Sequence, residues 1–406
     1  MRVRGLFDTY SEDPWMNLMD DSLTCILFST ADWDSPYWTN KQHMARSLAS
    51  RGIRVLFIES LGLRKPTINQ KDIQRMIRRL KKGFSGHREV EKNVFVLSPL
   101  AIPFKHHLMI VRMINQGLLR LQIKNFMKKQ DFQKPVIWTY HPFMLETISG
   151  LKTGPVVYHC VDDLSKVPGI NAEKYDAEEE KLLTRSEFVF TTSEYLVQKV
   201  KFTSKAYFFP NVVDLVHFER ARKSGPIPEE LLIIPEPRLV YVGALSDYKI
   251  DFQLIYESAI KKNKWQWVFI GEEREGQINS LVSKMRTLPN CHFLGYKAYK
   301  DLPEYLRGMQ VGLLPSLLNE YTKSMFPMKY YEYLAAGLPV VSTPLEFTKG
   351  IDKGILVGKD VDSFCRAIEE QIKRGRLTDE EAKNFVGENT WEKRLTKMLE
   401  IIRENL

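Results

Sequence analysis

The chain has 406 residues, of which 44% are hydrophobic and 27% charged, and it carries a formal net charge of +9 at pH 7. This length favours two domains over one hydrophobic core, and the composition excludes a disordered or collagen-like protein. No apolar stretch is long enough to span a bilayer, and the start of the chain lacks the apolar segment of a secretory signal. The four cysteines form no CxxC pair, which disfavours a zinc cluster or a disulfide framework. These features predict a cytoplasmic protein.

Short β-branched or aromatic runs alternate with helical patterns along the chain. Predicted strands of the first half are Leu23–Ser29, Arg54–Glu59, Val94–Leu97, Val136–Tyr140, Val156–His159 and Phe188–Thr192. Those of the second half are Leu239–Val242, Gln266–Ile270, Cys291–Leu294, Val311–Leu314, Val340–Ser342 and Gly354–Val357. Helical patterns between them include Asn40–Ser50, Ala177–Arg185, Phe252–Lys262 and Lys329–Ala336. This alternation predicts parallel sheets with helices on both faces.

A proline-rich break divides the two sets of strands. Residues 221–237 contain four prolines, a composition typical of an interdomain connector. We therefore predict an α/β fold of two doubly wound, Rossmann-like domains, residues 1–218 and 238–390, joined by a linker at 219–237. The final helix, 391–406, is predicted to cross back onto the first domain. A cleft between the two domains is the expected ligand site, because such sheets bind ligands at the carboxyl ends of their strands.

The positive charge is concentrated in the first half. Residues 64–130 contain 16 lysines and arginines against three acidic residues, whereas the rest of the chain is slightly acidic. Two amphipathic helices are predicted here, near 71–82 and 108–129, and both are rich in basic residues. They indicate contact with an anionic membrane surface, or else ordinary core-packing helices with solvated basic faces. A nucleic-acid partner is disfavoured because no recognition motif accompanies the charge.

The segment 311–343 carries the clearest chemical signal. No GxGxxG follows the first strand and no GxxxxGK[ST] occurs, which disfavours a dehydrogenase or a P-loop NTPase. A helix is predicted to begin near Pro327 and to end at Gly337. Lys329 in its first turn favours a bound diphosphate, since free amides at a helix N-terminus attract anions. Glu332, one turn later, is placed to accept hydrogen bonds from the two hydroxyls of a ribose.

These features resemble the GT-B glycosyltransferases, particularly bacterial family-4-like enzymes of exopolysaccharide and teichuronic acid pathways. The stretch 329–343 is similar to their donor-binding helix, and VGALSDYKID at 242–251 resembles their VGRLxxxKGxD motif. The resemblance extends over nearly the whole chain but is most specific in the second half. The donor-binding residues that it implies are Gly243, Lys249, Gly295, Tyr296, Ser324, Lys329 and Glu332.

Two positions depart from the family pattern. Ala244 replaces the arginine that usually pairs with the lysine at the diphosphate, and we expect Lys329 to supply the missing charge. Ser324 stands where the first glutamate of the family's Glu-x7-Glu motif is expected, so inversion or retention of configuration stays open. Glu320 either holds this loop instead or is a solvated carboxylate.

The first half is expected to supply the general base and the acceptor site. YHCVDDL resembles the family's YDxxDEL, and a carboxylate there would deprotonate the acceptor hydroxyl. Asp162 is the preferred base, and Asp163 and His141 are the other catalytic candidates. His159 is a further alternative for the base. The non-catalytic alternative is that Asp162 and Asp163 cap a helix.

The loop 31–43, after the first strand, is aromatic and polar where this class usually has glycines. It supplies five predicted acceptor-binding residues: Trp33, Tyr37, Trp38, Thr39 and Asn40. Thr39 and Asn40 are also candidates to face the donor phosphates. Asn40 is also predicted to cap the following helix. Asp32 and Asp34 are outside candidates for the base.

The resemblance implies a hexosyltransferase that moves a sugar from a nucleotide-diphosphate sugar, with UDP slightly preferred, to a lipid-linked or polysaccharide acceptor of the cell envelope. No cofactor and no metal are expected, and the enzyme is expected to rest on the inner face of the membrane. The alternatives are a nucleotide-sugar 2-epimerase of the same fold and a non-catalytic sugar-nucleotide-binding protein. The sugar, the nucleotide base and the acceptor stay open.

Overall fold

The computed structural model describes residues 23–60, 86–102, 109–200, 206–273 and 279–405. The basic helix predicted near 71–82 lies outside the described residues. The second predicted basic helix is present as α3 (Met109–Lys129). No helix of the described residues is both long and apolar enough to cross a membrane.

The first half of the chain builds an eight-stranded sheet in the order β3-β4-β2-β1-β5-β6-β7-β8. All neighbouring pairs are parallel except β3 and β4. Its strands are β1 (Thr24–Phe28), β2 (Arg54–Ile58), β3 (His87–Glu91), β4 (Val94–Leu97), β5 (Val136–Thr139), β6 (Val156–Cys160), β7 (Phe188–Thr191) and β8 (Ala206–Phe208).

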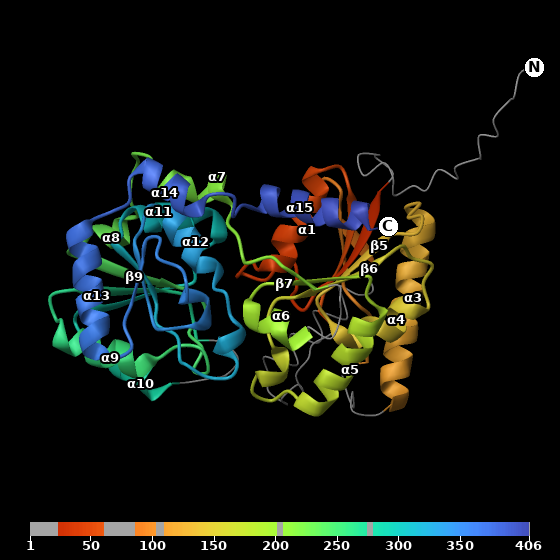
Figure 1. Ribbon diagram of the computed structural model, residues 1–406, viewed down its shortest axis with the longest axis horizontal. Helices are drawn as coiled ribbons and strands as arrows, with labels where there is room; N and C mark the ends of the chain where they lie inside the picture. Colours follow the sequence, from red (N-terminus) through yellow and green to blue (C-terminus); the bar gives the residue numbers. More distant parts are fainter. Residues whose placement is uncertain (1–22, 61–85, 103–108, 201–205, 274–278, 406) are drawn as a thin grey trace, which may run out of the picture.

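Helices cover both faces of this sheet because alternate residues of its strands are apolar on both sides. In β1, Cys25 and Leu27 join the core beneath α1 (Asn40–Ser50) and α15 (Trp391–Glu404), whereas Ile26 and Phe28 join the core beneath α3 and α5 (Ala172–Arg185). The helices are α1 (Asn40–Ser50), α4 (Leu145–Ser149), α5 (Ala172–Arg185), α6 (Glu194–Val200) and α15 (Trp391–Glu404), together with α3. Figure 1 shows the final helix α15 lying beside α1, although the two are far apart in sequence.

The second half builds a six-stranded sheet in the order β11-β10-β9-β12-β13-β14, parallel throughout. Its strands are β9 (Arg238–Val242), β10 (Gln266–Ile270), β11 (Cys291–Gly295), β12 (Val311–Leu314), β13 (Val340–Ser342) and β14 (Ile355–Val357). Its helices are α9 (Phe252–Lys261), α10 (Ser280–Met285), α11 (Leu302–Arg307), α12 (Met328–Ala335), α13 (Val361–Arg374) and α14 (Asp379–Val386). Two short helices, α7 (Leu215–Phe218) and α8 (Glu229–Leu232), lie in the connection between the sheets.

The predicted fold class is confirmed, and the differences are local. The sequence did not indicate β3, an edge strand whose residues are polar except for Val90, or β8, which has only three residues. The helix predicted at Ala177–Arg185 begins earlier, at Ala172, because the Asn171 side chain accepts a hydrogen bond from the Lys174 amide and caps it. Figure 1 shows the two sheets side by side as separate α/β units.

Candidate active site

The carboxyl ends of the central strands of the two sheets face each other. Strand order reverses beside β1 in the first sheet and beside β9 in the second, and ligands bind doubly wound sheets at such points. The loops that follow these strands are in direct contact. The Glu272 amide donates to Tyr37 Oη at 3.1 Å, and Tyr296 Oη donates to the Pro36 carbonyl at 3.0 Å.

Two glycines allow the loops of the second domain to pack closely. Gly243 and Gly271 directly follow β9 and β10 and have φ of 152° and 151°, a region that favours glycine. A Cβ on Gly271 would lie 1.9 Å from the Gly243 carbonyl oxygen and 3.3 Å from Tyr37 Oη. The predicted phosphate loop at Gly243 is therefore fixed against its neighbour and against the first domain.

Lys249 and Asp162 approach one another from opposite domains, with Tyr321 between them. The Lys249 ammonium lies 5.1 Å from the centre of the Tyr321 ring and 5.3 Å from that of Tyr248. Tyr321 Oη donates to Asp162 Oδ1 at 3.2 Å. The side chains of two sequence-predicted site residues, one from each domain, thus meet at a single tyrosine.

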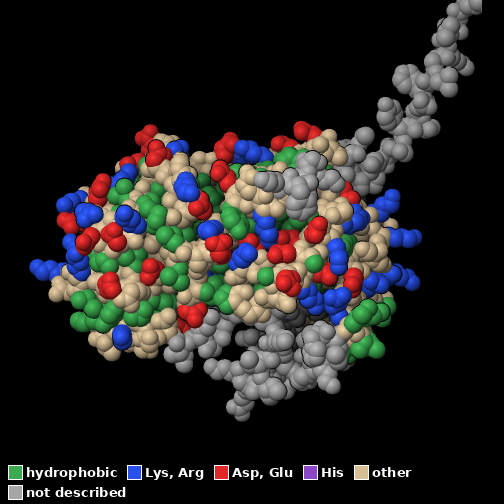
Figure 2. Space-filling view, turned by 60° about the horizontal axis from the view of Figure 1, so that its bottom comes forward, with side chains coloured by type: hydrophobic (Ala, Val, Ile, Leu, Met, Phe, Trp, Pro, Cys, Tyr) green, Lys and Arg blue, Asp and Glu red, His purple; other side chains and the backbone are tan. Residues whose placement is uncertain are grey.

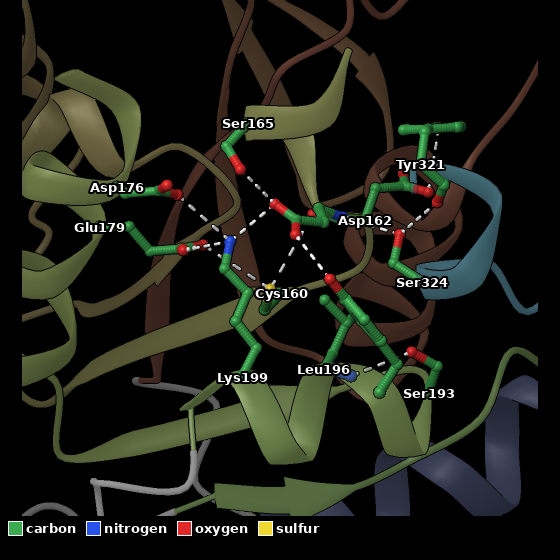
Figure 3. A network of polar contacts seen from close by, with 12 residues as sticks. Cys160, Asp162, Ser165, Asp176, Glu179, Ser193, Leu196, Lys199, Tyr321 and Ser324 are labelled. Carbon is green, nitrogen blue, oxygen red and sulfur yellow. Dashed lines mark hydrogen bonds and ion pairs between the residues drawn. The ribbon is translucent and has the colours of Figure 1, made fainter. Parts of the chain in front are cut away.

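Asp163 has a different environment from its neighbour. It is 1% exposed, its carboxylate pairs with Lys199 at 2.7 Å and it accepts a hydrogen bond from Ser165 Oγ at 2.7 Å. Lys199 also pairs with Glu179 at 2.7 Å, and Figure 3 shows its ammonium reaching from α6 into this group. Burial alone would lower the pKa of Lys199, but Glu179 and the hydrogen bond to Asp163 raise it above its ordinary value. The Asp163 carboxylate is therefore an internal ion-pair partner of the first domain.

Ser324 links this group to the second domain. It is fully buried, and its hydroxyl accepts a hydrogen bond from the Asp163 amide at 3.0 Å while donating to the Tyr321 carbonyl at 2.8 Å. Figure 3 shows Ser324 and Tyr321 on the same segment, beside Asp162. Ser324, which stands where the first glutamate of the motif is expected, therefore binds the backbone of the first domain. Glu320 pairs with Lys323 on the surface, in agreement with the solvated alternative.

The two candidate histidines are both buried. His141 is 3% exposed, its Nδ1 accepts from the Phe143 amide at 3.3 Å, and burial lowers its pKa to about 4. Its Nε2 is buried without a hydrogen-bond partner among the described residues. His159 is fully buried and its Nε2 accepts from Arg394 at 2.6 Å, which ties it to α15 inside the first domain. Both rings are therefore neutral near pH 7.

Lys329 and Glu332 lie at the boundary of the two domains but are bonded to each other. Lys329 donates to Glu332, whose side chain is 4% exposed. Met328, the first residue of α12, packs against the core of the first domain. Burial is the main cause that lowers the pKa of His43 in that domain, and the charges of Arg46 and Lys329 lower it further. The predicted boundaries of this helix agree with α12, but the Lys329 charge is already neutralised by Glu332.

The aromatic loop divides between core and interface. Trp33 is 6% exposed and packs edge-on against Phe57 in the core of the first domain. Trp38 lies under the Arg46 guanidinium at 4.1 Å and stacks on Tyr299 of the second domain at 6.0 Å. Of the predicted acceptor-binding residues, Tyr37 and Trp38 therefore contact the second domain, whereas Trp33 packs in the core of the first.

The predicted cap of α1 was wrong by one residue. The helix begins at Asn40 and Thr39 is its N-cap, since the Thr39 amide and hydroxyl both bond the Gln42 side chain. Asn40 is 5% exposed and accepts from Arg394 at 3.3 Å. Asp34 pairs with Arg88 on the surface of the first domain.

Sequence reasoning passed over Lys41. This lysine follows Asn40 in the first turn of α1 and is 7% exposed. The signal that the sequence offered was a lysine in a first helical turn without any acid, where the helix dipole disfavours a cation. Among the described residues, no group of three histidine, cysteine or acidic side chains is arranged to hold a metal ion.

Two parallel α/β domains whose loops meet at the carboxyl ends of their central strands define the GT-B class of glycosyltransferases. Residues 236–374, within the second half of the chain, match the protein family described as Glycosyl transferases group 1.

A curated protein is similar to part of the chain. The chain is 28% identical over 177 residues to TuaH of Bacillus subtilis (strain 168), described as a teichuronic acid biosynthesis glycosyltransferase. That match covers 43% of this chain and 44% of the relative, so it extends over less than half of either protein.

Solved structures share the fold over nearly the whole chain. Sucrose-phosphate synthase from Thermosynechococcus elongatus superposes with a TM-score of 0.70 at 16% identity, covering 94% of this chain and 98% of its own. HepE of Anabaena, in complex with UDP, gives 0.64 at 12% identity, with 94% and 100% covered. An Escherichia coli trehalose-6-phosphate protein bound to UDP-2-fluoro glucose gives 0.65 at 14% identity, with 94% and 99% covered.

Proposed function

We propose that this protein transfers a sugar from a nucleotide-diphosphate sugar, preferably a UDP-sugar, to a lipid-linked or polysaccharide acceptor of the cell envelope. One observation carries the proposal: Lys249 of the second domain and Asp162 of the first meet at Tyr321. A cation and a carboxylate facing each other across two domains are what glycosyl transfer requires. The cation stabilises the leaving diphosphate, and the carboxylate accepts the proton of the attacking hydroxyl.

The donor follows from the loops of the second domain. Gly243 follows β9 and packs against Gly271, and Lys249 comes six residues later; Tyr296 follows β11 at the position that the family resemblance gives to the nucleotide base. Two similar structures contain UDP or a UDP-sugar analogue, which supports uracil as the base. In this proposal lysines and helix amides, not a metal ion, stabilise the leaving group.

Asp162 is the base in this mechanism. Asp163 is already paired with Lys199 and buried, and His159 bonds Arg394, so neither can take up a proton from an acceptor without breaking that contact. Asp162 is partly exposed, and its carboxylate accepts a hydrogen bond from the Tyr321 hydroxyl. Tyr37 and Trp38, on the loop after β1 that reaches the second domain, would contact the acceptor.

A panel of nucleoside diphosphates, followed by donor turnover, tests the proposal. UDP is expected to raise the melting temperature, since a ligand at a hundredfold excess over its Kd stabilises a fold by about 2.7 kcal/mol. UDP-sugars incubated alone should stay unchanged and should be consumed only when a cell-envelope glycolipid extract is added. Conversion of the donor without acceptor would identify an epimerase instead. Absence of any nucleotide-dependent shift would contradict the proposal.

We further propose that α3 rests on an anionic lipid surface and brings the acceptor to the site. Its outward side is apolar over the first turns and basic over the last, and the helix contains no acidic residue. The exposed apolar residues are Met109, Ile110, Met113, Ile114, Leu118 and Leu121. Figure 2 shows green side chains below blue ones at the edge of the molecule where α3 lies. Helices bind anionic bilayers when their apolar side chains insert into the bilayer interface and neighbouring lysines contact the lipid headgroups.

Vesicle binding tests this contact. Replacing Lys124 and Lys128 with glutamine should weaken binding to vesicles that contain phosphatidylglycerol by roughly 10- to 30-fold, because each basic residue near such a surface contributes about 1 kcal/mol. Lys373 and Lys397, changed together in the same way, form the matched control because both lie on exposed helix faces of other elements. Equal loss in both double variants, or equal binding to neutral vesicles, would refute the lipid surface.

A further inference from the structure

One short segment of the second domain contacts two neighbouring acidic residues of the first. It consists of Tyr321 and the 3-10 helix η5 (Thr322–Ser324) that follows it. Tyr321 Oη donates to Asp162 Oδ1 at 3.2 Å, and the Asp163 amide donates to Ser324 Oγ at 3.0 Å. Figure 3 shows both side chains beside Asp162. The carboxylate proposed as the base and the backbone that follows it are therefore both held by the other domain.

The two hydroxyl-bearing side chains are fixed on the side of the second domain. Ser324 is fully buried, and its hydroxyl donates to the Tyr321 carbonyl at 2.8 Å. Because the same oxygen also accepts from the first domain, its orientation is determined by both contacts. Thr322 anchors the segment: its amide donates to Asn319 Oδ1 at 2.9 Å and its hydroxyl to the Leu317 carbonyl at 2.6 Å. The second domain therefore presents two oriented groups to the acids.

The loop before this segment is bonded to the residues around Lys249. The Leu317 amide donates to the Lys249 carbonyl at 2.9 Å, and Asn319 Nδ2 donates to the Tyr248 carbonyl at 2.9 Å. The Lys249 ammonium lies 5.1 Å from the centre of the Tyr321 ring. A continuous set of contacts therefore connects the cation of the second domain to the carboxylate of the first.

The first domain holds Asp163 from the other side. The Asp163 carboxylate pairs with Lys199 at 2.7 Å, whereas its amide donates to Ser324. The Asp162 carbonyl accepts from the Leu164 amide at 3.1 Å. The peptide between the two acids is therefore fixed by both domains, and this limits the positions that the Asp162 side chain can reach.

We propose that Tyr321 and Ser324 are positioning residues of the transfer reaction, which hold the Asp162 carboxylate in place for proton transfer when the two domains meet. This inference rests on the proposed function, in which Asp162 is the base. Tyr321 bonds the carboxylate directly, whereas Ser324 acts through the Asp163 amide. A misplacement of about 1 Å can lower a rate by about 100-fold, so two such bonds affect turnover strongly.

Tyr321→Phe tests the hydroxyl separately from the ring. The variant keeps the ring beside Lys249 and loses only the bond to Asp162. Single-turnover transfer from a UDP-sugar to the glycolipid extract should slow by roughly 10- to 100-fold, while the Kd of UDP, measured by calorimetry, stays unchanged. Tyr321→Leu also removes the ring and should weaken UDP binding by roughly 2- to 30-fold, the effect of losing a cation–π contact. Tyr305→Phe is the matched control and should change neither quantity, because this tyrosine hydroxyl donates to Glu230 instead.

Ser324→Ala tests the second contact. It removes the acceptor of the Asp163 amide, so transfer should slow by roughly 10- to 100-fold with unchanged UDP affinity. Ser186→Ala is the control for the loss of a fully buried serine hydroxyl, since Ser186 Oγ donates to the Leu182 carbonyl at 2.7 Å. Both variants should melt at a lower temperature, but Ser186→Ala should keep the wild-type rate. In the double variant with Tyr321→Phe, the loss should be smaller than the product of the single losses, because both bonds hold the same carboxylate.

Wild-type transfer rates in both Tyr321→Phe and Ser324→Ala would overturn the positioning roles and leave the proposed function intact. Equal slowing in Ser324→Ala and Ser186→Ala would overturn the role of Ser324, since a general loss of stability would then account for it. If the wild-type protein transfers no sugar from any UDP-sugar, the proposed function fails first, so the two failures are distinguishable.

Discussion

Asp162→Asn is expected to lower sugar transfer by about 10²- to 10⁴-fold, the usual contribution of a positioned general base. Asparagine retains an oxygen that accepts from Tyr321 Oη, so the contact between the domains should survive. Donor affinity should therefore stay near the wild-type value while kcat falls. The measurement is single-turnover transfer from the donor that the nucleotide panel identifies to the glycolipid acceptor.

Asp352→Asn is the control for this variant, because Asp352 is an exposed acid of the second domain. It should leave both kcat and donor affinity unchanged. If Asp162→Asn retained more than half of the wild-type turnover, another group would have to accept the proton. The buried, unpartnered Nε2 of His141 would then be the next candidate.

Lys199→Met is expected to destabilise the protein by about 3–5 kcal/mol, since it leaves two buried carboxylates without a counter-charge. Asp163 and Glu179 are 1% and 2% exposed and both pair with this lysine at 2.7 Å. Figure 3 shows Lys199 between these groups and α6, which carries it. The free energy of unfolding in urea is the quantity to measure, with retention of the fold checked by circular dichroism.

The stability deficit of Lys199→Met is expected to depend on pH in a definite direction. The pKa of Lys199 is raised in the folded protein, so the stability it contributes is fully present below its unfolded pKa of about 10.4. That contribution is lost only as the pH rises through the folded pKa. The deficit of Lys199→Met should therefore be constant from pH 7 to pH 10 and shrink above it.

Lys181→Met is the surface control for Lys199. The Lys181 side chain is 62% exposed and pairs with Glu178 at 3.2 Å, so its loss should change the unfolding free energy by less than about 1 kcal/mol. An equal decrease of the unfolding free energy in Lys199→Met and Lys181→Met would show that the buried ion pairs stabilise the protein no more than a surface pair does. An unchanged stability in Lys199→Met would contradict the network itself.

Periodicity and local capping made the fold predictable. Runs of apolar residues fixed most strands to within one or two positions, and Pro327 and Gly337 delimited α12 as predicted. Failures occurred where local signals are weak, as in the polar edge strand β3, or where two capping residues stand side by side, as with Thr39 and Asn40.

The candidate site was predictable only in part, because its contacts join residues that are far apart in sequence. Asp162 and Asp163 are indistinguishable as sequence neighbours. The fold turns one toward Tyr321, 159 positions away, and buries the other against Lys199. Nothing local could tell which of the two would meet the second domain.

The sequence by itself determined the two largely parallel sheets, helix α12 and the glycine turns, since these depend on the order of apolar, proline and glycine residues. Tertiary structure alone decided which charges are neutralised. Lys199 meets Asp163, which lies 36 positions earlier in the chain, and Lys249 lies over the ring of Tyr321. The physical reason is that the energy of a charge depends on its burial and on its neighbours, which only the folded chain brings together.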